Sequence, residues 1–150
     1  MSEMERKLTV EDARQSLTSH ATEKGAQFFE KYGPEITWKQ LLIAMEDRSV
    51  VRYPCRVSFE STGLLPGEMA HPFPEGNEPD EGFALRVHPI YMTDLHGAAA
   101  IVLYQIVLVN YGEFAGAEDA EAFGSAALGI DNEDYYRMLC ELADKLTVCH

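Results

Sequence analysis

The chain has 150 residues, of which 46% are hydrophobic and 25% are charged, a composition typical of one soluble globular domain spanning residues 1–150. Its formal net charge is −13, which argues against binding to nucleic acid or to an anionic membrane surface, because both require clustered Lys and Arg. The first residues contain no apolar segment of the signal-peptide kind, so we expect a cytoplasmic protein with reduced thiols.

The first part of the chain predicts two helices. Apolar residues recur at helical spacing and define one face of the first helix, which we expect to end at Gly33 and Pro34. The residues of this face are Leu17, Ala21, Gly25, Phe28 and Tyr32. Gly25 on an apolar face indicates close approach by another element. Thr37 and Gln40 have the spacing of a capping box, which predicts the start of a short second helix.

The period of the pattern then changes to two, which predicts strands. Apolar and polar residues alternate over residues 51–60, and a second alternating segment lies near residues 83–91. Pro54 cannot donate a ladder hydrogen bond, so we expect the first strand at an edge or with a bulge. We expect the two strands to form a small antiparallel sheet.

Residues 61–82, between the two strands, form a long segment that is rich in Gly and Pro and has no periodic pattern. A loop of this length inside a compact domain is usually functional or partly disordered. Because two strands alone are marginally stable, either part of this segment adds a strand or a partner chain extends the sheet.

A central helix is predicted at residues 94–110, which are apolar on nearly every side and are interrupted by Gln105. The apolar run is shorter than the roughly 20 residues that cross a bilayer, so we interpret it as a core helix. A helix that is apolar all round must be covered on most sides. Its own domain can cover it, or a two-fold related copy can do so in a homodimer.

Two further helical segments follow, one around residues 117–127 and a stronger one after Asp131. Strands therefore occupy the middle of the chain and helices occupy both ends. This order predicts an α+β fold in which a small antiparallel sheet, with strands near 51–60 and 83–91, is covered by about five helices, the central one being the apolar helix 94–110.

Three of the five histidines lie between residues 71 and 96, and they suggest a divalent metal site such as a zinc site. The candidate ligands are His71, His88 and His96, with Glu68 or Asp94 as oxygen donors. A catalytic zinc needs three such ligands and an open position for water. The spacing matches no compact ligand motif, however, and a histidine on a strand or in a first helical turn is commonly solvated or capping.

The strands also carry a candidate anion site. Arg52 and Arg56 lie on the first strand and Arg86 lies on the second. If the strands pair, these side chains share a face that could bind a carboxylate or a phosphate. The alternative is that each arginine pairs with an acidic neighbour.

The three cysteines match neither a metal-binding nor a disulfide spacing. We expect Cys55 and Cys140 to be core residues and Cys149 to be a thiol in the tail. Buried thiols of this kind are unreactive, so a cysteine nucleophile is not favoured.

Motifs for nucleophilic catalysis and for phosphate or dinucleotide binding are missing from the sequence. We therefore expect a non-catalytic interaction domain that acts as a homodimer and presents the long loop and a strand face to a protein partner or a small anionic ligand. The alternative is a metal-dependent hydrolase of the zinc type, or a metal-binding protein, that uses His71, His88 and His96.

Overall fold

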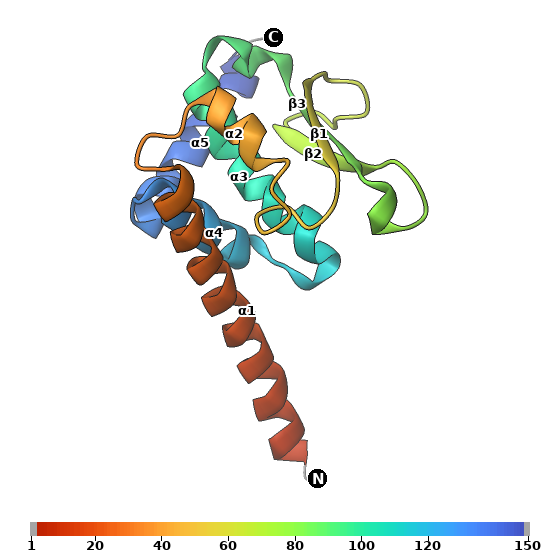
Figure 1. The fold of residues 1–150 in the computed structure, drawn as a ribbon, viewed down its shortest axis with the longest axis vertical. Helices are drawn as coiled ribbons and strands as arrows, with labels where there is room; N and C mark the ends of the chain where they lie inside the picture. The colour runs from red at the N-terminus through yellow and green to blue at the C-terminus, as the bar shows by residue number, and fades with distance from the viewer. Residues whose placement is uncertain (1–2, 149–150) are drawn as a thin grey trace.

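The structure, a computed structural model, describes the backbone of residues 3–148 and the side chains of residue 13 and residues 15–147. The described residues form five α-helices and one small sheet, arranged as in Figure 1, so the predicted α+β class is confirmed. The elements are α1 (Glu3–Tyr32), α2 (Trp38–Ala44), β1 (Cys55–Phe59), β2 (Ala70–Pro74), β3 (Phe83–Val87), α3 (Leu95–Tyr111), α4 (Ala117–Leu128) and α5 (Asn132–Val148).

The sheet has three strands in the order β1-β3-β2 and is mixed. The two strands expected from the sequence, β1 and β3, pair in parallel and not antiparallel, whereas β2 pairs antiparallel with β3. The reason is β2 itself, which lies inside the Gly- and Pro-rich segment 61–82. The chain reverses direction once into β2 and again into β3, so β3 runs the same way as β1. Of the two alternatives for completing the sheet, the one in which this segment adds a strand is the one observed.

Both edges of the sheet carry proline. Pro54 immediately precedes the edge strand β1, as predicted. On the other edge, Glu75 N, one residue beyond β2, donates to Gly82 O on the β3 side at 2.9 Å. Because ladder bonds alternate along a strand, the missing N–H groups of Pro72 and Pro74 fall on the free edge of β2. This edge is therefore poorly suited to pairing with a further strand.

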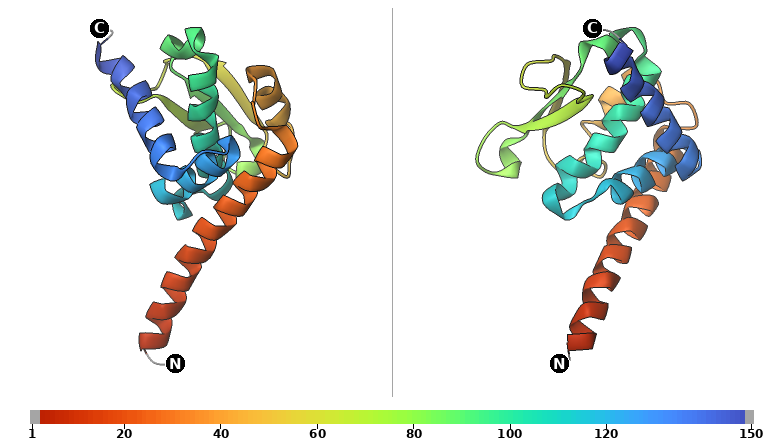
Figure 2. Two further views of the ribbon diagram at one scale, coloured as in Figure 1. Left: turned by 90° about the vertical axis from the view of Figure 1, so that its left-hand side faces the viewer. Right: turned by 180° about the vertical axis from the view of Figure 1, so that it is seen from behind.

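The apolar helix α3 runs through the middle of the molecule, between the sheet on one side and α4 and α5 on the other (Figures 1 and 2). The Asp94 side chain caps it by accepting a hydrogen bond from Gly97 N at 3.0 Å. By length and composition alone the segment Leu95–Phe114 could cross a membrane, but 67% of it is buried inside the fold. The prediction of a buried central helix is confirmed, and its own chain supplies most of the cover.

The helix α1 packs across α4 through the predicted apolar face, where Ala21 and Phe28 are buried. Gly25 makes the close approach that its position indicated, because a Cβ there would lie 2.4 Å from Phe123 O. The N-terminal half of the α1 backbone extends beyond the rest of the fold in all the ribbon views (Figures 1 and 2).

Candidate functional site

The described part of the molecule contains an apolar groove of about 430 Å³, which we call the α3 groove. Its floor is one strip of α3, formed by Ile101, Tyr104, Gln105 and Leu108. These positions follow the i, i+3, i+4, i+7 spacing of a single helix face. Other sides of α3 contact the sheet, α2, α4 and α5. The groove is therefore a place where an all-round apolar helix is left incompletely covered by its own chain.

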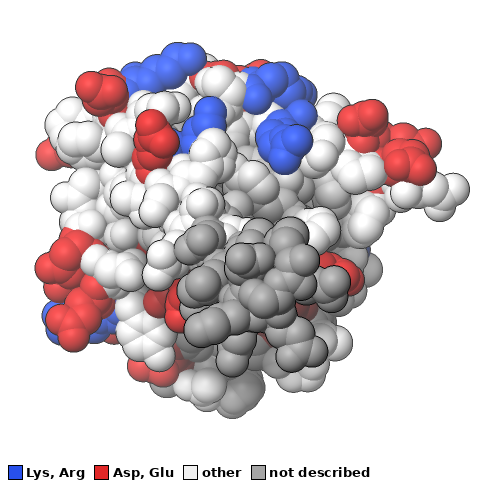
Figure 3. All heavy atoms as spheres, turned by 90° about the horizontal axis from the view of Figure 1, so that it is seen from below, with Lys and Arg blue, Asp and Glu red and all other residues white. Residues whose placement is uncertain are grey.

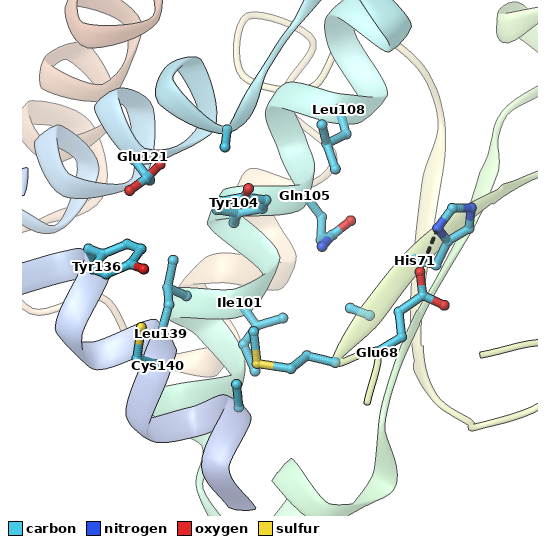
Figure 4. Close-up of a pocket in the computed structure, with 14 residues that line it drawn as sticks. Glu68, His71, Ile101, Tyr104, Gln105, Leu108, Glu121, Tyr136, Leu139 and Cys140 are labelled. Carbon is cyan, nitrogen blue, oxygen red and sulfur yellow. Dashed lines mark ion pairs between the residues drawn. The ribbon is translucent and has the colours of Figure 1, made fainter. Parts of the chain in front are cut away.

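Two walls enclose this floor (Figure 4). Helix α5 contributes Tyr136, Leu139, Cys140 and Ala143, and α4 adds residues from its N-terminal half. The opposite wall is the start of β2 and the residues just before it, 68–71. The apolar walls exclude water from a bound molecule, which is the general character of small-molecule sites.

Gln105 is the buried polar group of the groove. Its side chain is only 8% exposed, and its Oε1 atom has no hydrogen-bond partner among the described residues. Figure 4 shows the amide pointing away from the α3 backbone into the space between α3 and β2. A buried acceptor without a donor costs about 1–3 kcal/mol. An unpaired polar group in a native protein usually has a functional explanation. One such explanation is that the group accepts a hydrogen bond from a bound ligand.

A carboxylate lies on each side of the groove (Figure 4). On the β2 side, Glu68 forms an ion pair with His71 Nδ1 at 3.2 Å. On the α4 side, burial and then the nearby Glu118 raise the pKa of Glu121. No described cationic side chain forms an ion pair with Glu121, so its charge is uncompensated in the structure as it stands.

Two tyrosine rings lie next to Glu121. Tyr104 comes from the floor and lies between Glu121 and Gln105 in Figure 4, whereas Tyr136 comes from the α5 wall and lies near Glu121 at the outer end of the groove. Burial, and secondly the charge of Glu121, raises the pKa of Tyr104. The Tyr104 phenol therefore stays protonated near neutral pH, and the side chains of both tyrosines line the groove.

The three candidate histidines do not converge. His71 lies on β2 and pairs with Glu68, whereas His88 Nδ1 accepts a hydrogen bond from Ile90 N at 3.1 Å and caps the 3₁₀ turn Pro89–Thr93. His96 is exposed at the start of α3. Among the described residues, no group of three or more His, Cys, Asp and Glu could hold a metal ion.

The two acidic metal candidates are also engaged elsewhere. Besides its contact with His71, Glu68 Oε1 accepts a hydrogen bond from Leu65 N at 3.0 Å. Asp94 caps α3 and accepts a hydrogen bond from Lys145 Nζ at 2.9 Å, which lowers its pKa. The structure thus gives each of these groups a local structural role, and it does not favour the metal-site hypothesis.

The arginines of the candidate anion site are only partly brought together. Arg56 and Arg86 lie on the outer face of the sheet, because their strands pair, but Arg52 precedes β1 and contacts the Tyr111 ring and Asn110 O instead. Arg56 pairs with Glu75, and Arg86 Nη1 donates to Thr62 O at 2.7 Å.

Acidic and aromatic neighbours complete this surface. The Arg86 Nε atom lies 3.6 Å from Glu60, and its guanidinium stacks over the Phe73 ring at 4.7 Å. On the face seen in Figure 3, the few Lys and Arg side chains that show lie close to Asp and Glu side chains. The alternative that each arginine pairs with a neighbour is therefore the better description of Arg56 and Arg86.

The cysteines divide into one buried and one exposed thiol within the described residues. Cys55 is buried, as predicted, and burial raises its pKa to about 11. The prediction that Cys140 is a core residue is wrong, because it lies on the outer side of α5 at the rim of the α3 groove. Cys149 lies outside the described residues.

Comparison with known proteins gives no relative from which a function could be transferred: no protein-family model, no curated protein and no solved structure matches the chain. The site must be judged on its own geometry. Sequence reasoning did not identify the α3 groove, although one signal was present. Gln105 is a lone amide within a long apolar run, and such a residue needs either a partner or a ligand.

Proposed function

We propose that the protein is a non-catalytic binding domain that takes up a small ligand with an apolar body in the α3 groove. The observation that carries the proposal is the strip of α3 that lines the groove, where Tyr104 and Leu108 are only partly covered and the Oε1 atom of Gln105 has no partner among the described residues. Apolar contact with the strip contributes about 25 cal/mol for each Å² removed from water. The amide then provides orientation through a directional hydrogen bond.

This proposal retains the binding function expected from the sequence, but it places the binding site in the α3 groove. The expected surface was the long loop and the outer face of the strands, where Arg56 and Arg86 already have partners. The homodimer stays a prediction. Its original reason was the apolar excess of α3, which the chain itself covers except along the α3 groove.

The thiol at the rim offers a test that does not depend on a core mutation. In a Cys149→Ser background, N-ethylmaleimide should modify Cys140, since the other remaining thiol, Cys55, is buried. We expect the unmodified protein to bind the neutral dye Nile red saturably, with one site per chain. Alkylation of Cys140 places a bulky group over the groove and should weaken this binding about tenfold.

A matched control distinguishes blocking of the groove at Cys140 from any other effect of the reagent on the protein. The Cys140→Ser, Cys149→Ser protein, treated with the same reagent, should bind the dye as the untreated protein does. If the alkylated protein binds Nile red as tightly as the unmodified one, or if binding does not saturate, the α3 groove is not the binding site and the proposal fails.

A further inference from the structure

We infer that the ligand of the α3 groove is an organic cation, an amine or amidine carried on an apolar body. The inference rests on the proposed function and adds the chemical class of the ligand. It starts from the polar atoms that the groove presents. The carboxylate of Glu121 is the charged group without a described partner, and it requires a hydrogen-bond donor from the ligand. Gln105 adds an amide whose Oε1 atom has no donor but is enclosed by the protein, so the amide must turn toward the groove before this atom can accept a bond from a ligand.

The charge of the groove has one sign. Among the described residues that line it, carboxylates occur at both sides and neither Lys nor Arg occurs. On the β2 side Glu68 lies 3.2 Å from His71 Nδ1, whereas Glu121 on the α4 side has no basic partner among the described residues. Because Glu121 is partly withdrawn from water, a cation beside it gains more than it would at a fully exposed carboxylate.

The aromatic rings favour the same class of ligand. Tyr104 lies between Glu121 and the centre of the groove, and Tyr136 lies near Glu121 on α5 (Figure 4). A ring face attracts a cation, and the attraction is stronger when the cation is desolvated. An ammonium group at this end therefore meets a carboxylate and two rings, while an apolar body covers Ile101 and Leu139.

Other occupants fit less well. An anion would face the negative charge of Glu121, and no described Lys or Arg lines the groove to pair with it. An extended peptide cannot add to the free edge of β2 in a regular way, since Pro72 and Pro74 lack the N–H groups that such pairing needs. A second copy of the chain would bring its own net charge of −13 to an acidic groove.

A series of three probes with one apolar body tests the inference by calorimetry at neutral pH. 4-Phenylbutylamine, 4-phenylbutan-1-ol and 4-phenylbutyrate differ mainly in the charge of the head group. We expect the amine to bind about tenfold more tightly than the alcohol, and the butyrate to bind more weakly than the alcohol. Equal affinity of amine and alcohol would overturn the cationic class while leaving ligand binding in the groove intact. Binding of none of the three would overturn the proposed function as well.

Two isosteric variants test which carboxylate interacts with the ammonium group of the ligand. Glu121→Gln should remove most of the preference for the amine over the alcohol, with the two rings keeping the remainder, and should leave the affinity for the alcohol nearly unchanged. Glu118→Gln removes the same charge one turn away on α4, outside the groove lining, and should keep most of the amine preference. If Glu121→Gln keeps the full preference, Glu121 is not the partner of the cation and the inference fails. Sedimentation gives an independent check, because a dimer that alkylation of Cys140 dissociates would show that a second copy occupies the groove.

Discussion

Gln105 is a residue that we expect to lower the stability of the fold while serving ligand binding. Its Oε1 atom is buried at the floor of the groove without a donor among the described residues, so the folded protein bears the desolvation of an unpaired acceptor. We predict that Gln105→Leu raises the free energy of unfolding by about 1 kcal/mol, because an apolar side chain of similar size removes that penalty.

Urea denaturation measures the effect, and Asn110→Leu provides the contrast. The amide of Asn110 is satisfied, since it donates to Val50 O at 2.8 Å and accepts from Arg52 N at 2.8 Å. Its replacement should destabilise the protein by about 2 kcal/mol or more. A loss of stability in Gln105→Leu similar to that in Asn110→Leu would mean that Gln105 has a structural partner and is not a ligand-binding group.

Asp47 is the residue that joins the end of α1 to the segment after α2. Its carboxylate accepts hydrogen bonds from Lys31, from Tyr32 at 2.6 Å and from the Ser49 hydroxyl at 2.7 Å, and these bonds hold its pKa well below the ordinary range. A lowered pKa means that the charged form stabilises the fold above about pH 4, and that this contribution is lost as the pH falls below that value.

We therefore predict that Asp47→Asn lowers the free energy of unfolding by about 1 kcal/mol at pH 7, and that the difference from the wild type shrinks as the pH falls from about 5 towards 2. Denaturation curves over this range measure it. Asp144→Asn, an exposed change of the same charge on α5, should show no such pH dependence. A constant difference at every pH would exclude the charge of Asp47 as the source.

At the level of elements, the close contact between α1 and α4 depends on Gly25, which has no Cβ atom. A Cβ at residue 25 would lie 2.4 Å from Phe123 O and 2.7 Å from the Cβ of Ala126. Alanine favours a helix over glycine by about 1 kcal/mol, but forcing atoms into a packed contact typically costs 1–3 kcal/mol.

We predict that Gly25→Ala lowers the melting temperature and the free energy of unfolding, the latter by about 1–2 kcal/mol. Ser19→Ala, on the exposed side of the same helix, should change the stability by less than about 0.5 kcal/mol. A more stable Gly25→Ala protein, as helix propensity alone would give, would show that α1 and α4 are not packed as closely as described.

The elements also show how far local patterns predict this fold. The apolar face of α1, the capping box of Thr37 and Gln40, and the all-round apolar α3 are local signals, and each corresponds to the observed helix. The direction of β3 was not predictable in this way. It depends on β2, whose five residues include two prolines and resemble a loop, and which forms because β3 offers it a partner.

For the whole molecule, the α3 groove arises only when four elements meet. Its floor comes from α3 and its walls come from the two following helices, α4 and α5, and from the start of β2, which precedes α3 by more than twenty residues. The clustering of histidines in the sequence was a misleading signal, because the fold places His71, His88 and His96 in three separate local environments. A lone amide in an apolar helix was the better signal, since burial of α3 left Gln105 without a partner.

The central claim, that the α3 groove takes up an apolar cation, is tested most directly by methyl-labelled NMR during a titration with 4-phenylbutylamine. We expect saturable shifts of the methyl groups of Ile101, Leu108 and Leu139, which line the groove, and unchanged methyl signals of Ile43 and Leu65, which are exposed elsewhere. Saturable shifts confined to residues outside the groove, or the lack of any saturable shift, would contradict the account.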